Sequence, residues 1–213
     1  MLNKLSVLLT EKMLQKGSIT KEDRELYVYG SFMLLSHLLY LVLICIVGLL
    51  LGCILESLVF YVAFQFIRGY AGGYHAKTES RCEILSALSL VVCIVLIRLS
   101  KSYDLQTVLF ILSIISAVCI TIFSPLDTPE KPLSKKERKY FRKISLVILF
   151  VIIAVILTTY ILHFNALLIS CCCSVILEAI LILCGKIQYM RLRYHNRIVN
   201  SPENTSKIND LEK

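Results

Sequence analysis

The stretch "ISLVILFVIIAVILTTYIL", residues 144–162, decides the fold class of this chain. It contains no charged side chain and is long enough to cross about 30 Å of hydrocarbon as a helix. Similar runs recur along the 213 residues, which are 57% hydrophobic overall, whereas a soluble domain is nearer to about 45–50%. We therefore expect an all-α polytopic membrane protein, because each span must satisfy its own backbone hydrogen bonds.

The hydrophobic pattern predicts about six transmembrane helices. The expected spans are 33–47, a short second helix that ends near 67, and then 83–97, 105–123, 144–162 and 165–184. The first pair is the least defined, because residues 48–57 contain no clear polar loop. We expect a tight turn there, with a re-entrant hairpin as the alternative.

Lysine and arginine alternate between the connections, and this alternation predicts the orientation. Basic residues are frequent before the first span, after the second, between 131 and 143, and after the last span. They are rare in the other connections, so both termini are expected in the cytoplasm. Insertion and contact with anionic membrane lipids account for the net charge of +8, and we expect no nucleic acid as a partner.

One integral membrane domain is expected over residues 1–200, followed by a disordered tail at 201–213. Within the domain, residues 1–26 are expected to form an amphipathic segment. Leu2, Leu5 and Leu9 recur there at helical spacing, with charged residues between them. That pattern is typical of a helix that lies on the membrane surface.

The polar stretch "RGYAGGYHAKTESRC", residues 68–82, separates two apolar runs and is expected to face the cytoplasm. It contains Cys82, whereas the other eight of the nine cysteines lie in or near apolar spans. Cysteines there act as small hydrophobic residues, and we expect no metal site and no cofactor. "SRCE" has the pattern of a capping box with Ser80 as N-cap and Glu83 at the third helical position. A helix that starts there would stabilise a Cys82 thiolate, with further positive charge from Lys77.

His75 lies seven positions before Cys82. A neutral imidazole can take the proton of a thiol and later return it to a leaving amine. Gly72 and Gly73 favour a turn that could fold the histidine back, because glycine admits positive φ angles. A continuous helix would also place both residues on one face. The alternative without function is an interfacial histidine and an idle thiol.

The same stretch closely resembles the central motif of the AgrB family, the accessory gene regulator B proteins of Gram-positive quorum sensing. That motif has an arginine, small residues, "HA", and a cysteine seven after the histidine. Two further segments resemble the family, namely "SPLDTPEKPLS" at 124–134, which precedes a basic stretch, and "LEAI" at 177–180.

The resemblance implies a cysteine endopeptidase in the cell membrane of a Gram-positive bacterium, with an AgrD-like pro-peptide as substrate. By this resemblance Cys82 is the nucleophile that holds the peptide as a thioester, and His75 is the general base. A cysteine or serine of the peptide would then attack the acyl group and close a thiolactone or lactone ring. The expected substrate-binding or orienting residues are Arg68, Gly72, Gly73 and Lys77. The resemblance is also compatible with a homodimer.

A small transporter or channel is the main alternative function. Its evidence is Glu56 and Glu178, because carboxylates within a membrane often mark ion paths. Either residue could equally pack against polar neighbours, so Glu178 is expected to be a structural or functional intramembrane residue. A transporter needs no cytoplasmic thiol beside a histidine, and neither does a non-enzymatic scaffold, which is the third class considered.

Overall fold

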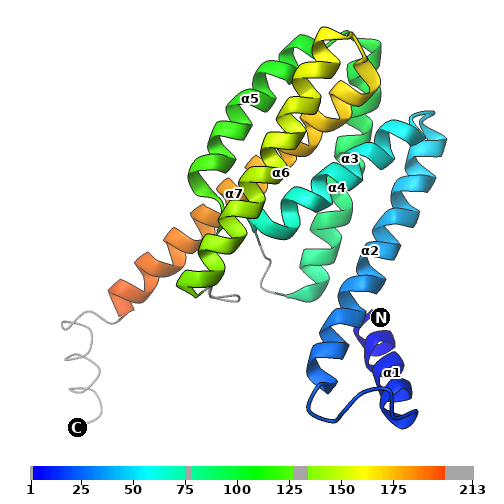
Figure 1. Cartoon of the computed structure of the whole chain (residues 1–213), viewed down its shortest axis with the longest axis vertical. Coiled ribbons are helices and arrows are strands. Elements are labelled where there is room, and N and C mark those ends of the chain that lie inside the picture. The colour runs from blue at the N-terminus through cyan, green and yellow to red at the C-terminus, as the bar shows by residue number, and fades with distance from the viewer. Residues whose placement is uncertain (1, 75–77, 127–133, 200–213) are drawn as a thin grey trace.

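The computed structural model describes residues 2–74, 78–126 and 134–199, and all regular structure in that part of the chain is helical (Figure 1). The helices are α1 (Leu2–Gln15), α2 (Arg24–Leu50), α3 (Ile54–Ala71), α4 (Glu79–Ser102), α5 (Gln106–Phe123), α6 (Lys135–Ile161) and α7 (Asn165–Val199). Six of them, α2 to α7, are long and apolar enough to cross a membrane. The prediction of an all-α polytopic membrane protein with about six spans and an N-terminal amphipathic helix is confirmed. The expected tail at 201–213 lies outside the described residues.

Most helices extend beyond the spans expected from hydropathy. α2 begins at Arg24 and α7 continues to Val199, because polar residues can continue a helix where the hydrocarbon ends. α6 begins among basic residues at a capping box, in which the Ser134 side chain accepts from the Glu137 N–H and the Glu137 side chain accepts from the Ser134 N–H. The tight turn expected between the first two spans is confirmed at residues 51–53, where Gly52 has a φ of +67°.

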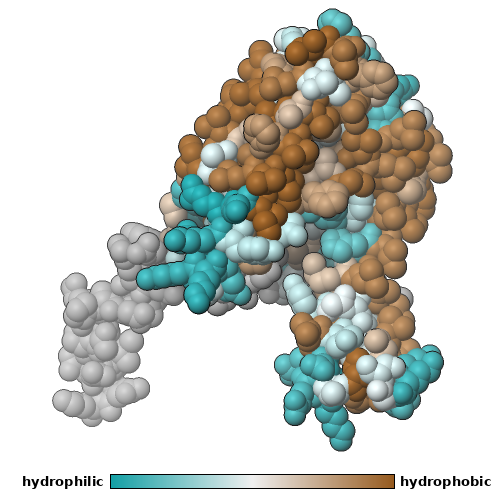
Figure 2. Space-filling model, in the orientation of Figure 1, coloured by the Kyte–Doolittle hydropathy of each residue, from teal (hydrophilic) through white to brown (hydrophobic). Residues whose placement is uncertain are grey.

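The spanning helices run alternately between two ends of the molecule (Figure 1). One end, here called the α1 end, carries α1, residues 72–74, residues 124–126 and the start of α6. The opposite end carries the short turns at 51–53, 103–105 and 162–164. Figure 2 shows a hydrophobic surface over the body of the molecule and hydrophilic patches at the α1 end. Such a distribution is what a protein needs when its middle faces lipid.

α7 is the central helix of the bundle. Of its apolar window, 67% is buried inside the protein, whereas the other spans are at most 33% buried. It packs against α3, α4, α5 and α6, and its core residues include Cys171, Cys172 and Cys173. These three cysteines pack among apolar side chains, so the interpretation of them as small hydrophobic residues is confirmed. A segment that rests on α7 therefore rests on the most enclosed element of the fold.

Candidate active site at the end of α3

The chain leaves α3 through two glycines that no other residue can replace without strain. Gly72 and Gly73 have φ angles of +76° and +148°, in a region that side chains disfavour. A Cβ on Gly73 would lie 1.6 Å from Nη1 of Arg68, and one on Gly72 would lie 3.0 Å from the carbonyl oxygen of Leu126. The turn predicted from the glycine pair is therefore confirmed, and a side chain at 73 would also displace the Arg68 guanidinium.

Arg68, in the last turn of α3, holds the segment that follows these glycines. Its Nη1 donates to the Gly72 carbonyl at 2.8 Å and its Nη2 donates to the Tyr74 carbonyl at 2.7 Å. A guanidinium is planar and presents its donors as a rigid fork, so one side chain can fix two carbonyls at once. Arg68 thereby fixes the backbone up to the residue that immediately precedes His75.

The other side of this segment rests on α7 and on residues 124–126. The Tyr74 N–H donates to the Leu181 carbonyl at 3.0 Å, and the Leu126 N–H donates to the Ala71 carbonyl at 3.0 Å. Gly185 of α7 leaves room for this contact, since a Cβ there would lie 2.9 Å from the Tyr74 nitrogen. Segment 124–134, the second segment that resembles the family in sequence, thus begins beside the glycine turn. Sequence reasoning did not foresee Gly185.

Glu178 of α7 lies close to the Arg68 guanidinium of α3. Its carboxylate is fully buried, and its Oε1 is 4.0 Å from Nη1 of Arg68. Among the described residues, neither of its carboxylate oxygens has a hydrogen-bond partner. Glu56 lies at the opposite end, where it pairs with Lys101 at 2.5 Å. The two carboxylates that suggested an ion path are therefore at different ends, and each faces its own basic side chain.

Cys82 lies in the first turn of α4, but the predicted capping box is wrong. The N-cap is Thr78, whose backbone is extended and whose side chain makes no capping hydrogen bond, and the helix starts at Glu79. The Cys82 N–H already donates to the Thr78 carbonyl at 3.1 Å, which leaves Cys82 within the first turn and half-buried. α4 packs against α2 and α7. His75 and Lys77 lie outside the described residues, and their roles stay predictions.

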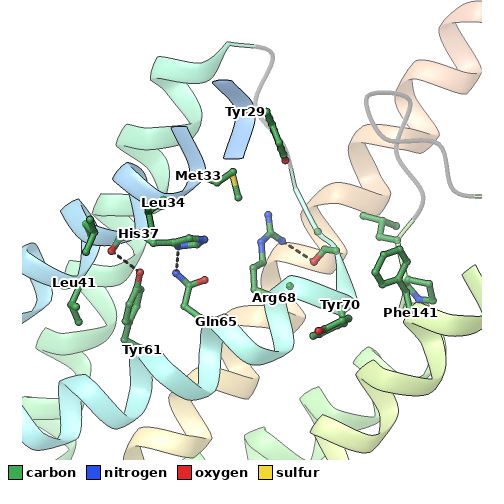
Figure 3. Close-up of a pocket in the computed structure, with 16 residues that line it drawn as sticks. Tyr29, Met33, Leu34, His37, Leu41, Tyr61, Gln65, Arg68, Tyr70 and Phe141 are labelled. Atoms are coloured by element: carbon green, nitrogen blue, oxygen red, sulfur yellow. Dashed lines mark hydrogen bonds between the residues drawn. The ribbon is translucent and has the colours of Figure 1, made fainter. Parts of the chain in front are cut away.

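A cavity of about 440 Å³ opens beside the glycine turn (Figure 3). The first half of α2 forms an apolar wall, α3 contributes polar side chains, and Gly72 and Gly73 contribute backbone. The lining residues are Tyr29, Met33, Leu34, His37, Leu38, Leu41, Tyr61, Gln65, Arg68, Gly69, Tyr70, Gly72, Gly73, Pro125, Leu126 and Phe141. An apolar cavity with a few convergent polar groups is the usual form of a binding site.

Three side chains, those of His37, Tyr61 and Gln65, order the polar part of this cavity, and the sequence analysis missed all three. Gln65 Nε2 lies 2.8 Å from His37 Nδ1, and the Tyr61 hydroxyl donates to the His37 carbonyl at 3.1 Å (Figure 3). Tyr61, Gln65 and Arg68 share one face of α3, because residues three and four apart on a helix are neighbours. That spacing of polar residues within an apolar run, leading to the predicted Arg68, was the signal that could have found Tyr61 and Gln65.

Fold and site together define a multi-pass helical membrane protein with an arginine-anchored glycine turn beside a cavity at one end. The chain belongs to the AgrB family, whose family model, described as accessory gene regulator B, matches residues 6–183. The resemblance found in the sequence motifs is thus confirmed.

Named relatives are similar over half of the chain or more. A putative AgrB-like protein of Clostridium perfringens is 28% identical over 172 residues, which cover 78% of this chain and 80% of the relative. Accessory gene regulator protein B of Staphylococcus intermedius is 33% identical over 110 residues, or 51% of this chain and 56% of the relative. Protein FsrB of Enterococcus faecalis is 30% identical over 113 residues, or 53% and 46%. No solved structure matches this chain.

Proposed function

We propose that this chain is a membrane cysteine endopeptidase that cleaves an AgrD-like quorum-sensing pro-peptide and promotes its cyclisation. The observation that carries the proposal is the double hydrogen bond from Arg68 to the carbonyls of Gly72 and Tyr74. These bonds fix the chain up to the residue before His75, beside a cavity. The first turn of α4, which carries Cys82, begins at the same end of the molecule (Figure 1). Membership of the AgrB family supports a pro-peptide as the substrate.

The proposed reaction is acyl transfer through Cys82. The thiolate attacks the scissile carbonyl, the peptide C–N bond breaks, and a thioester forms with the N-terminal part of the substrate. His75 takes the thiol proton and gives it to the leaving amine. A cysteine or serine of the bound peptide then attacks the thioester, which closes the ring and restores the Cys82 thiol. When the acceptor is a thiol, one thioester replaces another, so no ATP is needed.

The cavity beside the turn is the proposed binding site for the substrate residues next to the scissile bond. Its α2 wall suits apolar side chains, whereas the His37–Gln65 pair and Arg68 offer polar contacts at fixed positions. Gly72 and Gly73 allow close approach of the substrate, because they present backbone without side chains. Lys77, next to this segment in sequence, would supply positive charge to the peptide or to the thiolate.

The α1 end is proposed to face the cytoplasm. The start of α6 exposes a basic cluster there, made up of Lys135, Lys136, Arg138, Lys139, Arg142 and Lys143, whereas the turns at 51–53, 103–105 and 162–164 contain no lysine or arginine. Cytoplasmic connections carry this excess. α1 exposes Leu5, Leu8 and Leu9, as a helix on the inner membrane surface would. A cysteine placed near Lys136 that labels from outside intact cells would reverse this orientation.

The nucleophile can be tested by cleavage of an AgrD-type pro-peptide that is co-expressed with the chain. We expect Cys82→Ala to abolish cleavage while the protein remains in the membrane fraction. Cys172→Ala is the matched control, because it removes a thiol from the core of α7 and should leave most cleavage intact. Cleavage by Cys82→Ala at the wild-type level would refute the assignment of Cys82 as the nucleophile.

A further inference from the structure

We infer that Glu178 and Gly185 of α7 hold residues 72–74 in place, and so act as positioning residues for His75, which follows that segment in sequence. The inference rests on the proposed pairing of His75 with Cys82. It concerns how the imidazole is brought to the thiol, and it adds two residues with no catalytic contact of their own. Gly185 lies beyond residues 6–183, the part of the chain that matches the family model.

Gly185 carries the first half of the argument, through close packing. A Cβ at this position would lie 2.9 Å from the Tyr74 nitrogen, 3.0 Å from the Gly73 carbonyl carbon and 2.5 Å from Cδ2 of Leu126. The leucine methyl is the end of a flexible side chain and can move. The two backbone atoms cannot move without displacing residues 73–74. Glycine at 185 is thus what lets the segment before His75 lie directly against the helix.

The hydrogen bond from the Tyr74 N–H to the Leu181 carbonyl completes this contact at 3.0 Å. Leu181 is one helical turn before Gly185, so the two residues present adjacent parts of the α7 surface to residues 73–74. The segment is therefore held by one polar contact and one close-packed contact on the same helix. An added methyl group at 185 would push it away from both.

Glu178 carries the second half, through charge. A buried carboxylate is costly unless a cation or hydrogen bonds compensate it. In the described part of the chain no hydrogen bond reaches it, and its ion pair is with Arg68 at 4.0 Å. The same Nη1 of Arg68 that lies 4.0 Å from Glu178 donates to the Gly72 carbonyl at 2.8 Å, and Nη2 donates to the Tyr74 carbonyl at 2.7 Å. Glu178 thus holds the guanidinium inward, where its fork can bind both carbonyls.

The reactivity of Cys82 tests this inference without a peptide substrate. The full-length protein is reconstituted in lipid nanodiscs at neutral pH, and mass spectrometry follows the alkylation of Cys82 by iodoacetamide. His75→Ala sets the scale, since losing the base that removes the thiol proton should slow alkylation about tenfold. We expect Gly185→Ala and Glu178→Gln each to slow it about three- to tenfold. Glu178→Asp, which keeps the charge, should react faster than Glu178→Gln.

Three controls separate positioning from damage to the fold. Gly30→Ala adds the same methyl group to a helical glycine with nothing within 4 Å of the new atom. Cys82 in this variant should be alkylated at the wild-type rate. Cys93 and Cys172 are buried and should stay unlabelled in every variant. The double variant Gly185→Ala with Leu126→Ala should remain slow, because it relieves only the contact with the leucine side chain.

Each outcome decides between the two proposals. If His75→Ala slows the alkylation of Cys82 but Gly185→Ala and Glu178→Gln leave its rate at the wild-type value, the positioning inference is overturned and the proposed function stands. If His75→Ala has no effect, the Cys82–His75 pair fails and the inference fails with it. Labelling of Cys93 or Cys172 in the α7 variants would mean that Glu178 and Gly185 hold the fold together, which also overturns the inference.

Discussion

The two ends of the molecule reverse the chain in different ways. At the opposite end the turns close on local hydrogen bonds, such as Cys53 N–H to the Gly48 carbonyl at 2.8 Å, Ser57 Oγ to the Cys53 carbonyl at 2.7 Å and Phe164 N–H to the Thr159 carbonyl at 2.9 Å. At the α1 end the chain that leaves α3 is instead held by a side-chain fork, two glycines and a neighbouring helix. A turn that only joins two helices can rely on one positive-φ glycine, as Gly52 shows, and does not need an arginine fork. The difference indicates that residues 72–74 are held in a particular position, as the proposed catalytic role of the following residues would require.

The two ion pairs show the same contrast. Lys101 and Glu56 pair at 2.5 Å at the opposite end, where the lysine side chain is 34% exposed and the glutamate side chain 10% exposed. Arg68 and Glu178 are farther apart, at 4.0 Å, yet the glutamate is fully buried. An exposed pair contributes about 0–1 kcal/mol to stability, whereas breaking a buried pair leaves an uncompensated charge. Changes at the two ends should therefore differ both in kind and in size.

The largest effect after loss of Cys82 itself is expected from Arg68→Lys. A lysine keeps the charge but cannot hold the Gly72 and Tyr74 carbonyls together in the fork geometry. Losing one charged hydrogen bond should lower pro-peptide cleavage about ten- to a hundredfold. The matched change at the opposite end, Lys101→Arg, should leave cleavage unchanged. Equal losses from the two variants, measured as initial cleavage rates in membranes, would remove the distinction between the ends.

A moderate effect is expected from Gly69→Leu, which reduces the cavity volume. Gly69 lines the cavity, and a Cβ added there meets no atom within 4 Å, so the leucine should enter open space. We expect KM for the pro-peptide to rise about fivefold, since apolar contacts and volume govern such sites, with kcat little changed. Gly30→Leu, outside the cavity lining, is the control. An unchanged KM in Gly69→Leu would place the substrate elsewhere.

The smallest effect is expected from Glu56→Gln at the opposite end. It removes the ion pair with Lys101, which is partly exposed, and should lower the free energy of unfolding by no more than about 1 kcal/mol. Thermal unfolding in detergent and the cleavage rate measure the two consequences. A loss of cleavage at unchanged stability would show that the opposite end takes part in the function, and would revive an ion path as an explanation.

The sequence predicted the architecture well, because it follows from hydropathy and from the length needed to cross a membrane. The tight turn before Ile54 was predicted from the lack of a polar loop, and the glycine turn after Ala71 from Gly72 and Gly73, which permit backbone angles that other residues avoid. The start of α4 was predicted wrongly. Thr78 and Ser80 both suit an N-cap, and the extended backbone at Thr78 selected the earlier position.

The interior contacts of the site could not be predicted. Arg68 and Glu178 are far apart in sequence, and only the packing of α3 on α7 brings them together. Gly185 looks like an ordinary glycine in an apolar helix until residues 73–74 are seen to rest on it. The cavity depends on α2 facing α3 with His37 opposite Gln65. A single sequence does not show which residues of two helices will face each other. Tertiary packing decides these features, and local sequence patterns do not encode it.

The most direct test of the account is whether Cys82 carries the peptide as a thioester. An AgrD-type pro-peptide with its ring-closing residue changed to alanine is co-expressed with the chain, and the intact mass of the purified protein is measured. Without its acceptor the acyl group should remain on the enzyme, because water is a poor substitute in a shielded site. We predict an adduct that neutral hydroxylamine removes and that is missing from Cys82→Ala. Linear peptide released at the normal rate with no adduct at any time would contradict the account.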